Sequence, residues 1–218
     1  LDVVLTSRGK GSTERIPMCG VPYHAADAYI AKLIKAGLKV AICEQIEDPK
    51  EAKGIVKRDI IRVITSGTFF DEAGFDARYV LALAFSPRGT GIAMNDTASG
   101  TILTTQCEQN NKVIDILSKL PDFECVFPES QKDRVKEMLK APLLRSKNIT
   151  LSPYEDWCFN PDIARKALLE HFKTRNLRGY GVEDLSAAQS SAGALIEYLK
   201  AMTKQPLSHI DRLSLYTD

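Results

Sequence analysis

Residues 16–54, "IPMCGVPYHAADAYIAKLIKAGLKVAICEQIEDPKEAKG", place one short helix and one apolar strand among turns rich in glycine and proline. Between Ala26 and Ile34 the apolar side chains recur at spacings of three and four residues, which puts them on one face of a helix. Gly37 follows at the position where a helix commonly ends. The stretch therefore predicts an amphipathic helix that packs its apolar face on something else.

Together with the residues on either side of it, this helix is predicted to form a small mixed α/β unit over residues 1–65. β-branched and apolar runs predict strands at Leu1–Thr6, Leu38–Glu44 and Asp59–Thr65. The sequence "DPKE" that starts at Asp48 has a capping-box pattern, which predicts a second helix of one or two turns ending at Gly54.

A second unit begins after residues 66–78, which are predicted to be a linker. Three neighbouring strands with short turns, Tyr79–Ser86, Ile92–Asn95 and Thr101–Cys107, predict an antiparallel meander. The other predicted elements are a short buried strand at Cys125–Pro128 and helices at Asn110–Leu120, Ser130–Lys140, Pro161–Lys173 and Leu185–Lys204. Three strands followed by helices and interposed strands predict an α/β layer fold of the RNase-H-like type.

Composition favours a soluble globular protein, since 44% of the 218 residues are hydrophobic and 26% are charged. No run approaches the roughly 18 consecutive apolar residues that a membrane helix needs. The five cysteines lie at least eighteen residues apart, which excludes a CxxC metal pair and disfavours a disulfide framework. Residues 1–65 hold eleven Lys or Arg against eight Asp or Glu, a balance compatible with contacts to phosphates.

No catalytic motif stands out. His24, His171 and His209 lie on different predicted elements without metal-ligand spacing, and no GxxxxGK[ST] or GxSxG sequence occurs. Asp96 ends a predicted strand and could hold Mg²⁺ in an RNase-H-like nuclease, but the companion strands "LALAF", "ILTTQ" and "CVFP" supply no carboxylates. A turn role for Asp96 is favoured. We therefore expect no catalytic and no metal-binding residues, and we expect the chain to be a binding module. An RNase-H-like nuclease and a purely partner-binding module remain the alternatives.

The stretch from residue 16 to residue 68 closely resembles the mismatch-recognition domain of the MutS family of bacterial DNA mismatch repair proteins. The family pattern runs Pro-Met-x-Gly-[Ile/Val]-Pro-x-His-Ala, Tyr-x-x-Lys-Leu, Val-Ala-Ile-Cys-Glu-Gln, Asp-Pro, Lys-Gly and Val-x-Arg-x-[Val/Ile]-x-Arg. The matching residues are Pro17, Met18, Gly20, Val21, Pro22, His24, Ala25, Tyr29, Lys32, Leu33, Val40 to Gln45, Asp48, Pro49, Lys53, Gly54, Val56, Arg58, Ile60 and Arg62. More loosely, "DTASG" and "RNLRGYGVED" resemble parts of the family's connector domain.

The chain departs from the family pattern at two places. Ser66 replaces the usual proline of Thr-Pro-Gly-Thr, which loosens that turn. The family's Phe-x-Glu motif, whose Phe stacks on the mispaired base, does not occur near the beginning. We therefore expect a piece of a longer protein: a partial mismatch-recognition domain (1–65), a linker (66–78), an RNase-H-like connector domain (79–206) and the start of the following core domain (207–218).

The resemblance implies contacts with mismatched double-stranded DNA. Arg8, Lys10 and Arg15 are expected to meet phosphates, and Met18 to present an apolar contact beside the mispaired base. A solvated basic loop remains the alternative for the three cations, and core packing the alternative for Met18.

The resemblance also implies partners and cofactors of the parent protein. The connector would link DNA binding to an ATPase domain that lies outside this chain and binds ATP and Mg. The parent protein would be a homodimer in the bacterial cytoplasm, associated with the nucleoid. The connector would also offer a surface to MutL, and the helix over residues 162–172 is expected to form part of it. Arg165, Lys166 and Glu170 would face outward while Ile163 and its apolar neighbours pack inward. A solvated helix face is the alternative.

Overall fold

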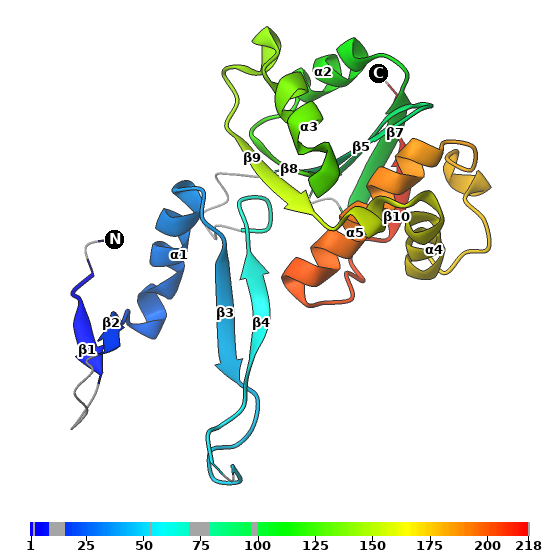
Figure 1. Cartoon of the computed structure of the whole chain (residues 1–218). Helices are drawn as coiled ribbons and strands as arrows, with labels where there is room; N and C mark the ends of the chain where they lie inside the picture. Colours follow the sequence, from blue (N-terminus) through cyan, green and yellow to red (C-terminus); the bar gives the residue numbers. More distant parts are fainter. Residues whose placement is uncertain (2, 9–15, 53, 70–78, 97–99, 218) are drawn as a thin grey trace.

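The computed structural model describes residues 1, 3–8, 16–52, 54–69, 79–96 and 100–217, including the backbone but not the side chains of Arg8 and Asp96. We call residues 1–69 the N-terminal unit and residues 79–217 the C-terminal unit; they lie side by side, and a long hairpin projects from the N-terminal unit (Figure 1). The predicted α/β class is confirmed. No helix within the described ranges is long and apolar enough to cross a membrane.

Among its described residues, the N-terminal unit contains two separate antiparallel strand pairs, one α-helix and one short 3₁₀ helix. Its elements are β1 (Thr6–Arg8), β2 (Ile16–Met18), the short helix η1 (Tyr23–Ala25), α1 (Ala26–Lys35), β3 (Val40–Gln45) and β4 (Arg58–Ile64). β1 pairs with β2, and β3 with β4. Ile30 and Ile34 of α1 are buried against Ile64, so the predicted apolar face of the helix packs on the base of the β3–β4 hairpin.

Two expectations for this unit were wrong. The first strand is Thr6–Arg8 instead of Leu1–Thr6, because the described residues before it have no strand to pair with and Leu5 is 73% exposed. The capping pattern at Asp48 forms a turn instead of a helix: Asp48 Oδ1 accepts a hydrogen bond of 2.9 Å from the Lys50 amide, and residues 49–51 continue as a turn. So short a helix has an unfavourable nucleus and, here, no apolar face to bury.

The C-terminal unit is a six-stranded sheet between two layers of helices. Its elements are β5 (Tyr79–Ser86), β6 (Gly89–Asp96), β7 (Thr101–Cys107), α2 (Asn110–Lys119), β8 (Phe123–Pro128), η2 (Glu129–Gln131), α3 (Lys132–Leu139), η3 (Pro142–Leu144), β9 (Ile149–Tyr154), η4 (Asp156–Phe159), α4 (Pro161–His171), η5 (Arg178–Tyr180), α5 (Ser186–Thr203) and β10 (Arg212–Leu215). The strand order is β10-β7-β6-β5-β8-β9. β5, β6 and β7 form the predicted antiparallel meander, while β8 and β9 run parallel to β5, as an RNase-H-like sheet requires.

Each face of the sheet has its own core. Val80, Ala82 and Ala84 of β5 point into a cluster with α4 and α5, whereas Leu81 and Leu83 point into a cluster with α2 and α3. Because successive side chains of a strand alternate between faces, a strand covered on both sides must be apolar throughout. Figure 1 shows the two helix layers on opposite sides of the sheet.

The last strand lies at the edge of the sheet. Arg212–Leu215, within the stretch 207–218 that was predicted to start a following domain, pair in parallel with β7 and extend the sheet. Leu207, Ile210 and Leu213 are buried in the core on the α4–α5 side. This segment packs as part of the C-terminal unit.

Candidate nucleic-acid interface

The ribbon formed by β1 and β2 carries the residues that were expected to meet DNA. In its register Thr6 faces Met18 and Arg8 faces Ile16, and the Thr6 hydroxyl donates a hydrogen bond of 2.8 Å to the Met18 carbonyl oxygen. The structure thus brings the backbones of Arg8 and Met18 onto one small ribbon. Lys10 and Arg15 fall in the connection between the two strands, outside the described residues.

Apolar side chains around this ribbon are exposed. Met18 is 45% exposed. The other large apolar side chains exposed near it are Val4, Leu5, Ile16, Val21 and Tyr23. Several exposed apolar side chains on and near one ribbon are typical of a surface that binds something else.

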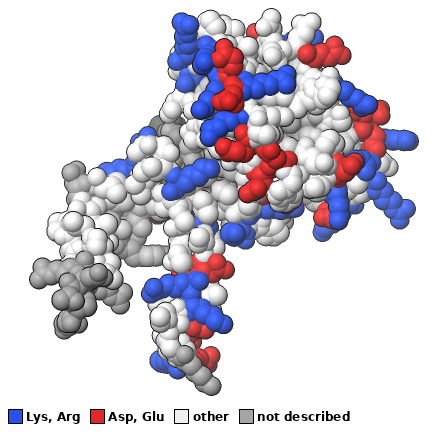
Figure 2. All heavy atoms as spheres, viewed as in Figure 1, with Lys and Arg blue, Asp and Glu red and all other residues white. Residues whose placement is uncertain are grey.

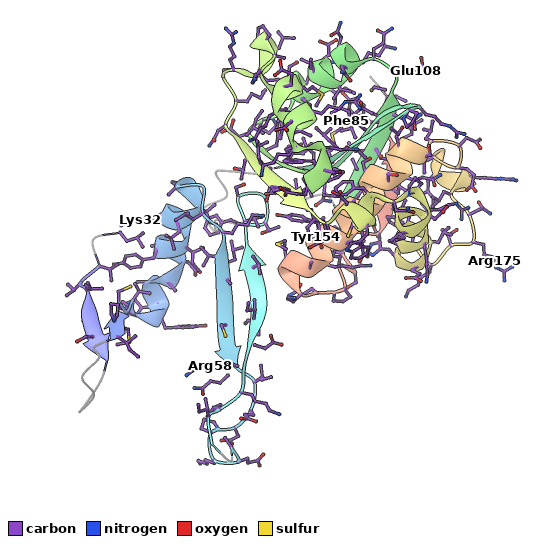
Figure 3. All side chains as sticks on the ribbon, viewed as in Figure 1. Lys32, Arg58, Phe85, Glu108, Tyr154 and Arg175 are labelled. Carbon is purple, nitrogen blue, oxygen red and sulfur yellow. The ribbon has the colours of Figure 1, made fainter. Side chains whose placement is uncertain are left out.

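The β3–β4 hairpin offers a different surface. Lys, Arg, Asp and Glu are interspersed along it in Figure 2, so the hairpin has no one-sign patch on that face. Arg58 lies on its outer part, away from the C-terminal unit (Figure 3). Arg62, nearer the base, donates a hydrogen bond of 3.2 Å to the Thr68 carbonyl oxygen, so it braces the end of the hairpin.

The three residues proposed for a partner surface on α4 have different surroundings. Arg165 makes an ion pair of 2.6 Å with Glu183, and Glu183 also accepts a hydrogen bond of 2.5 Å from the Leu177 amide. These bonds, with Arg165 first, lower the pKa of Glu183. Lys166 and Glu170 are 3.8 Å apart and well exposed, a pairing worth little in stability. Arg165 therefore braces a loop, while Lys166 and Glu170 face solvent.

The outer face of α4 is less polar than expected. Ile163 was expected to pack inward but is 39% exposed, and Trp157 of the neighbouring η4 is 53% exposed. Asn160 begins the helix: its side-chain oxygen accepts hydrogen bonds from the Asp162 and Ile163 amides, which fixes the helix start as the sequence indicated.

A buried carboxylate lies where the two units meet. Glu124 of β8 is fully buried, and hydrogen-bond donors from four residues converge on its two oxygens. We call these residues the junction cluster: Thr65, Gly67, Glu124, Ser152 and Tyr198. Burying an unpaired carboxylate costs several kcal/mol, and charge-assisted hydrogen bonds are what offset that cost.

Sequence reasoning missed Glu124. The predicted strand began at Cys125, two residues after the true start at Phe123, so the carboxylate stood outside it. A detectable signal was present: in "DFECVFP" a single Glu interrupts an otherwise apolar run, and a charge inside a buried strand must have partners.

The junction cluster also bears on the nuclease alternative. The oxygens of Glu124 are occupied by protein donors, and among the described residues no group of three or more His, Cys, Asp or Glu is placed to hold a metal ion. Asp96 occupies the last position of β6, paired with Thr101, but its side chain lies outside what is described.

Comparison with known proteins agrees with this arrangement. Residues 1–73 match the family model for MutS domain I, and residues 78–211 match that for MutS domain II. The chain belongs to the MutS family. The resemblance found in the sequence is thereby confirmed, and MutS domain I ends just beyond the Thr65–Thr68 turn that contacts Glu124.

Individual MutS relatives match over almost the whole chain. The DNA mismatch repair protein MutS of Lachnoclostridium phytofermentans is 40% identical over 99% of this chain, and that of Symbiobacterium thermophilum is 40% identical over 99%. The MutS of Thermodesulfovibrio yellowstonii is 41% identical over 94%. The matched regions make up 23%, 25% and 23% of these relatives, so the chain spans about a quarter of their length.

Proposed function

We propose that this chain contacts mispaired or unpaired bases in duplex DNA and links that contact to the rest of a mismatch repair protein. The observation that carries the proposal is Met18, an exposed apolar side chain on a ribbon whose other strand ends in Arg8. The membership of the chain in the MutS family supports the same interpretation.

In this proposal the β1–β2 ribbon presses on DNA at a weak base pair. Apolar side chains that enter a base step kink the duplex at a cost of a few kcal/mol, and the cost is lowest where pairing is already disturbed. Sequence-dependent deformability then becomes the signal. Arg8, Lys10 and Arg15 would hold the backbone phosphates on either side of Met18, which fixes the register without reading bases.

The C-terminal unit would act as the connector. Lys166 and Glu170, with the exposed apolar side chains of Trp157 and Ile163 beside them, would form part of a surface for MutL. Further domains, lying elsewhere in the parent protein, would bind ATP and Mg and form a homodimer in the cytoplasm, in association with the nucleoid. No enzymatic step is proposed for this chain.

Binding to two labelled duplexes, one with a single G·T mismatch and one fully matched, tests the proposal. We expect the chain to bind with an affinity that falls steeply as salt rises, because phosphate contacts release counterions. Replacing Arg8, Lys10 and Arg15 together by Ala should reduce the slope of log affinity against log salt by about 3. Lys136→Ala on α3 is the matched control and should leave the slope unchanged.

Met18→Ala tests whether Met18 recognises the mismatch. A preference for the mismatched duplex that this substitution abolishes would assign the reading of the mismatch to Met18. Equal binding to both duplexes would mean that only backbone contacts occur in this chain. The absence of salt-dependent binding to either duplex would contradict the proposal, and Mg²⁺-dependent cleavage of the duplex would favour the nuclease alternative.

A further inference from the structure

Two segments of the N-terminal unit reach the C-terminal unit at the base of the β3–β4 hairpin. Lys39 immediately precedes β3, and the turn Thr65–Thr68 immediately follows β4. Both meet side chains of the junction cluster. The position and direction of the whole hairpin therefore depend on how these two segments are held.

The turn is held by hydrogen bonds between its own residues. The Thr65 amide donates 2.9 Å to the Thr68 hydroxyl, and the Thr68 amide donates 3.2 Å to the Thr65 carbonyl oxygen. Thr65, Ser66 and Thr68 are all buried although they connect two units. A buried turn whose two threonines are hydrogen-bonded to each other transmits a displacement instead of absorbing it.

Glu124 receives hydrogen bonds from both units at once. From the N-terminal unit, the Thr65 hydroxyl donates 2.5 Å and the Gly67 amide 2.9 Å to Oε2. From the C-terminal unit, Tyr198 donates 2.6 Å to Oε1, and Ser152 donates to the same oxygen. One carboxylate thus joins two donors from each side.

The fit around Gly67 is close enough to specify the residue. A methyl group there would lie 2.8 Å from Glu124 Oε2 and even closer to Val80 of the central strand. The amide can approach the carboxylate only because Gly67 has no side chain.

Tyr198 extends the junction cluster to Lys39 and to the helix layer. The Lys39 ammonium donates 3.4 Å to the Tyr198 hydroxyl and lies 5.5 Å from its ring centroid. Tyr154 packs edge-on against the same ring, with centroids 5.1 Å apart, on the side of the C-terminal unit that faces the hairpin (Figure 3). Tyr198 belongs to α5, the longest described helix, so both ends of the hairpin base are tied to that helix.

We propose that Glu124 and Tyr198 are positioning residues that fix the direction of the β3–β4 hairpin relative to α5. A displacement of the hairpin is then passed to the helix layer of the C-terminal unit instead of being lost at a flexible joint. The significance of this coupling for DNA recognition rests on the proposed function, whereas the coupling itself does not require DNA.

The experiment measures the distance between the two units in the chain without DNA. One spin label is placed on Cys43, which is exposed on β3, and the other is introduced by Lys136→Cys on α3. Cys19→Ser removes the other exposed thiol, and the remaining three cysteines are buried. Pulsed electron spin resonance then gives the distribution of distances between hairpin and C-terminal unit.

Two matched substitutions separate positioning from general stability. Thr65→Val and Ser152→Ala each remove one hydroxyl that donates to Glu124, the first from the N-terminal unit and the second from within the C-terminal unit. We expect Thr65→Val to broaden the distance distribution and to lower the exchange protection of the Gly67 amide by about tenfold, as for a lost charge-assisted bond. Ser152→Ala should leave the distribution at its original width.

Either of two results overturns the proposal: an unchanged distribution in Thr65→Val, or equal broadening in both variants. Tyr198→Phe, which keeps the ring but removes the hydroxyl shared by Lys39 and Glu124, is expected to broaden the distribution as Thr65→Val does. Far-ultraviolet circular dichroism verifies that each variant is folded. Because no DNA is present, failure here and failure of DNA binding are distinguishable.

Discussion

Gly193 of α5 gives a prediction in which two physical effects have opposite signs. Replacing Gly by Ala inside a helix favours folding by about 1 kcal/mol, because Ala loses less backbone entropy. In this structure, however, a methyl group on Gly193 would lie 2.6 Å from the Cα and 2.7 Å from the carbonyl carbon of Ala164 in α4, and closer still to its oxygen.

Backbone atoms of α4 cannot rotate away as a side chain would, so the two helices must separate. Overpacking costs typically about 1–3 kcal/mol, and contacts with a rigid backbone put Gly193→Ala at the upper end of that range. Set against the gain in helix propensity, the net result is a loss of about 2 kcal/mol in the free energy of unfolding.

Urea unfolding followed by far-ultraviolet circular dichroism and by the fluorescence of Trp157, the single tryptophan, measures this loss. Trp157 lies in η4, which packs against α5, so it reports on the affected layer. Gly179→Ala is the matched control, since no atom lies within 4 Å of the added methyl. A Gly193→Ala variant as stable as the unsubstituted chain, or more stable, would refute the reasoning.

Three further predictions follow from local geometry. Gly67→Ala should lower the free energy of unfolding by about 2–3 kcal/mol, because the methyl group overpacks the site and weakens the hydrogen bond to Glu124. Ser66→Ala removes a buried hydroxyl without a hydrogen-bond partner and should be neutral or stabilising. Urea unfolding midpoints of the two variants test both expectations. Asn160→Ala should cost about 1 kcal/mol by the same measurement, because two amides at the start of α4 lose their acceptor. Burial lowers the pKa of His171 below its ordinary value of 6.5, so the folded state binds fewer protons than the unfolded state. The contribution of neutral His171 to stability is present above pH 6.5 and is lost as pH falls from the unfolded-state pKa to the lower folded-state pKa. Urea unfolding midpoints measured across this pH range should fall less in His171→Gln than in the unsubstituted chain. An equal fall of the midpoint in both proteins would contradict the assignment of this pH dependence to His171.

Several elements were predictable from residues close together in the chain. The helix from Ala26 and the strands Tyr79–Ser86 and Thr101–Cys107 were identified with correct or nearly correct bounds. In each, the period of apolar side chains matches the geometry of the element, and burial of that face then stabilises it. The match to the MutS pattern was likewise readable from residues 16–68 alone.

The candidate site was predictable only in part. Met18 was singled out from the sequence, and its exposure is consistent with a contact surface, whereas the contacts of Arg8, Lys10 and Arg15 stay predictions. The ion pair between Arg165 and Glu183 joins residues eighteen positions apart, and no local pattern indicates it.

By itself, the sequence determined the α-helices of the described residues, the meander, the RNase-H-like class and the family, because each depends on short-range periodicity or on a continuous motif. Only the tertiary structure decided that β10 joins the sheet beside β7 and that Glu124 lies under the Thr65–Thr68 turn. Strand pairing and buried hydrogen bonds join residues far apart in the chain, and burial rather than local propensity sets their free energy. Glu124 is the example: the sequence indicates that this carboxylate needs partners, but only the tertiary structure shows that four donors enclose it and that two of them come from the N-terminal unit.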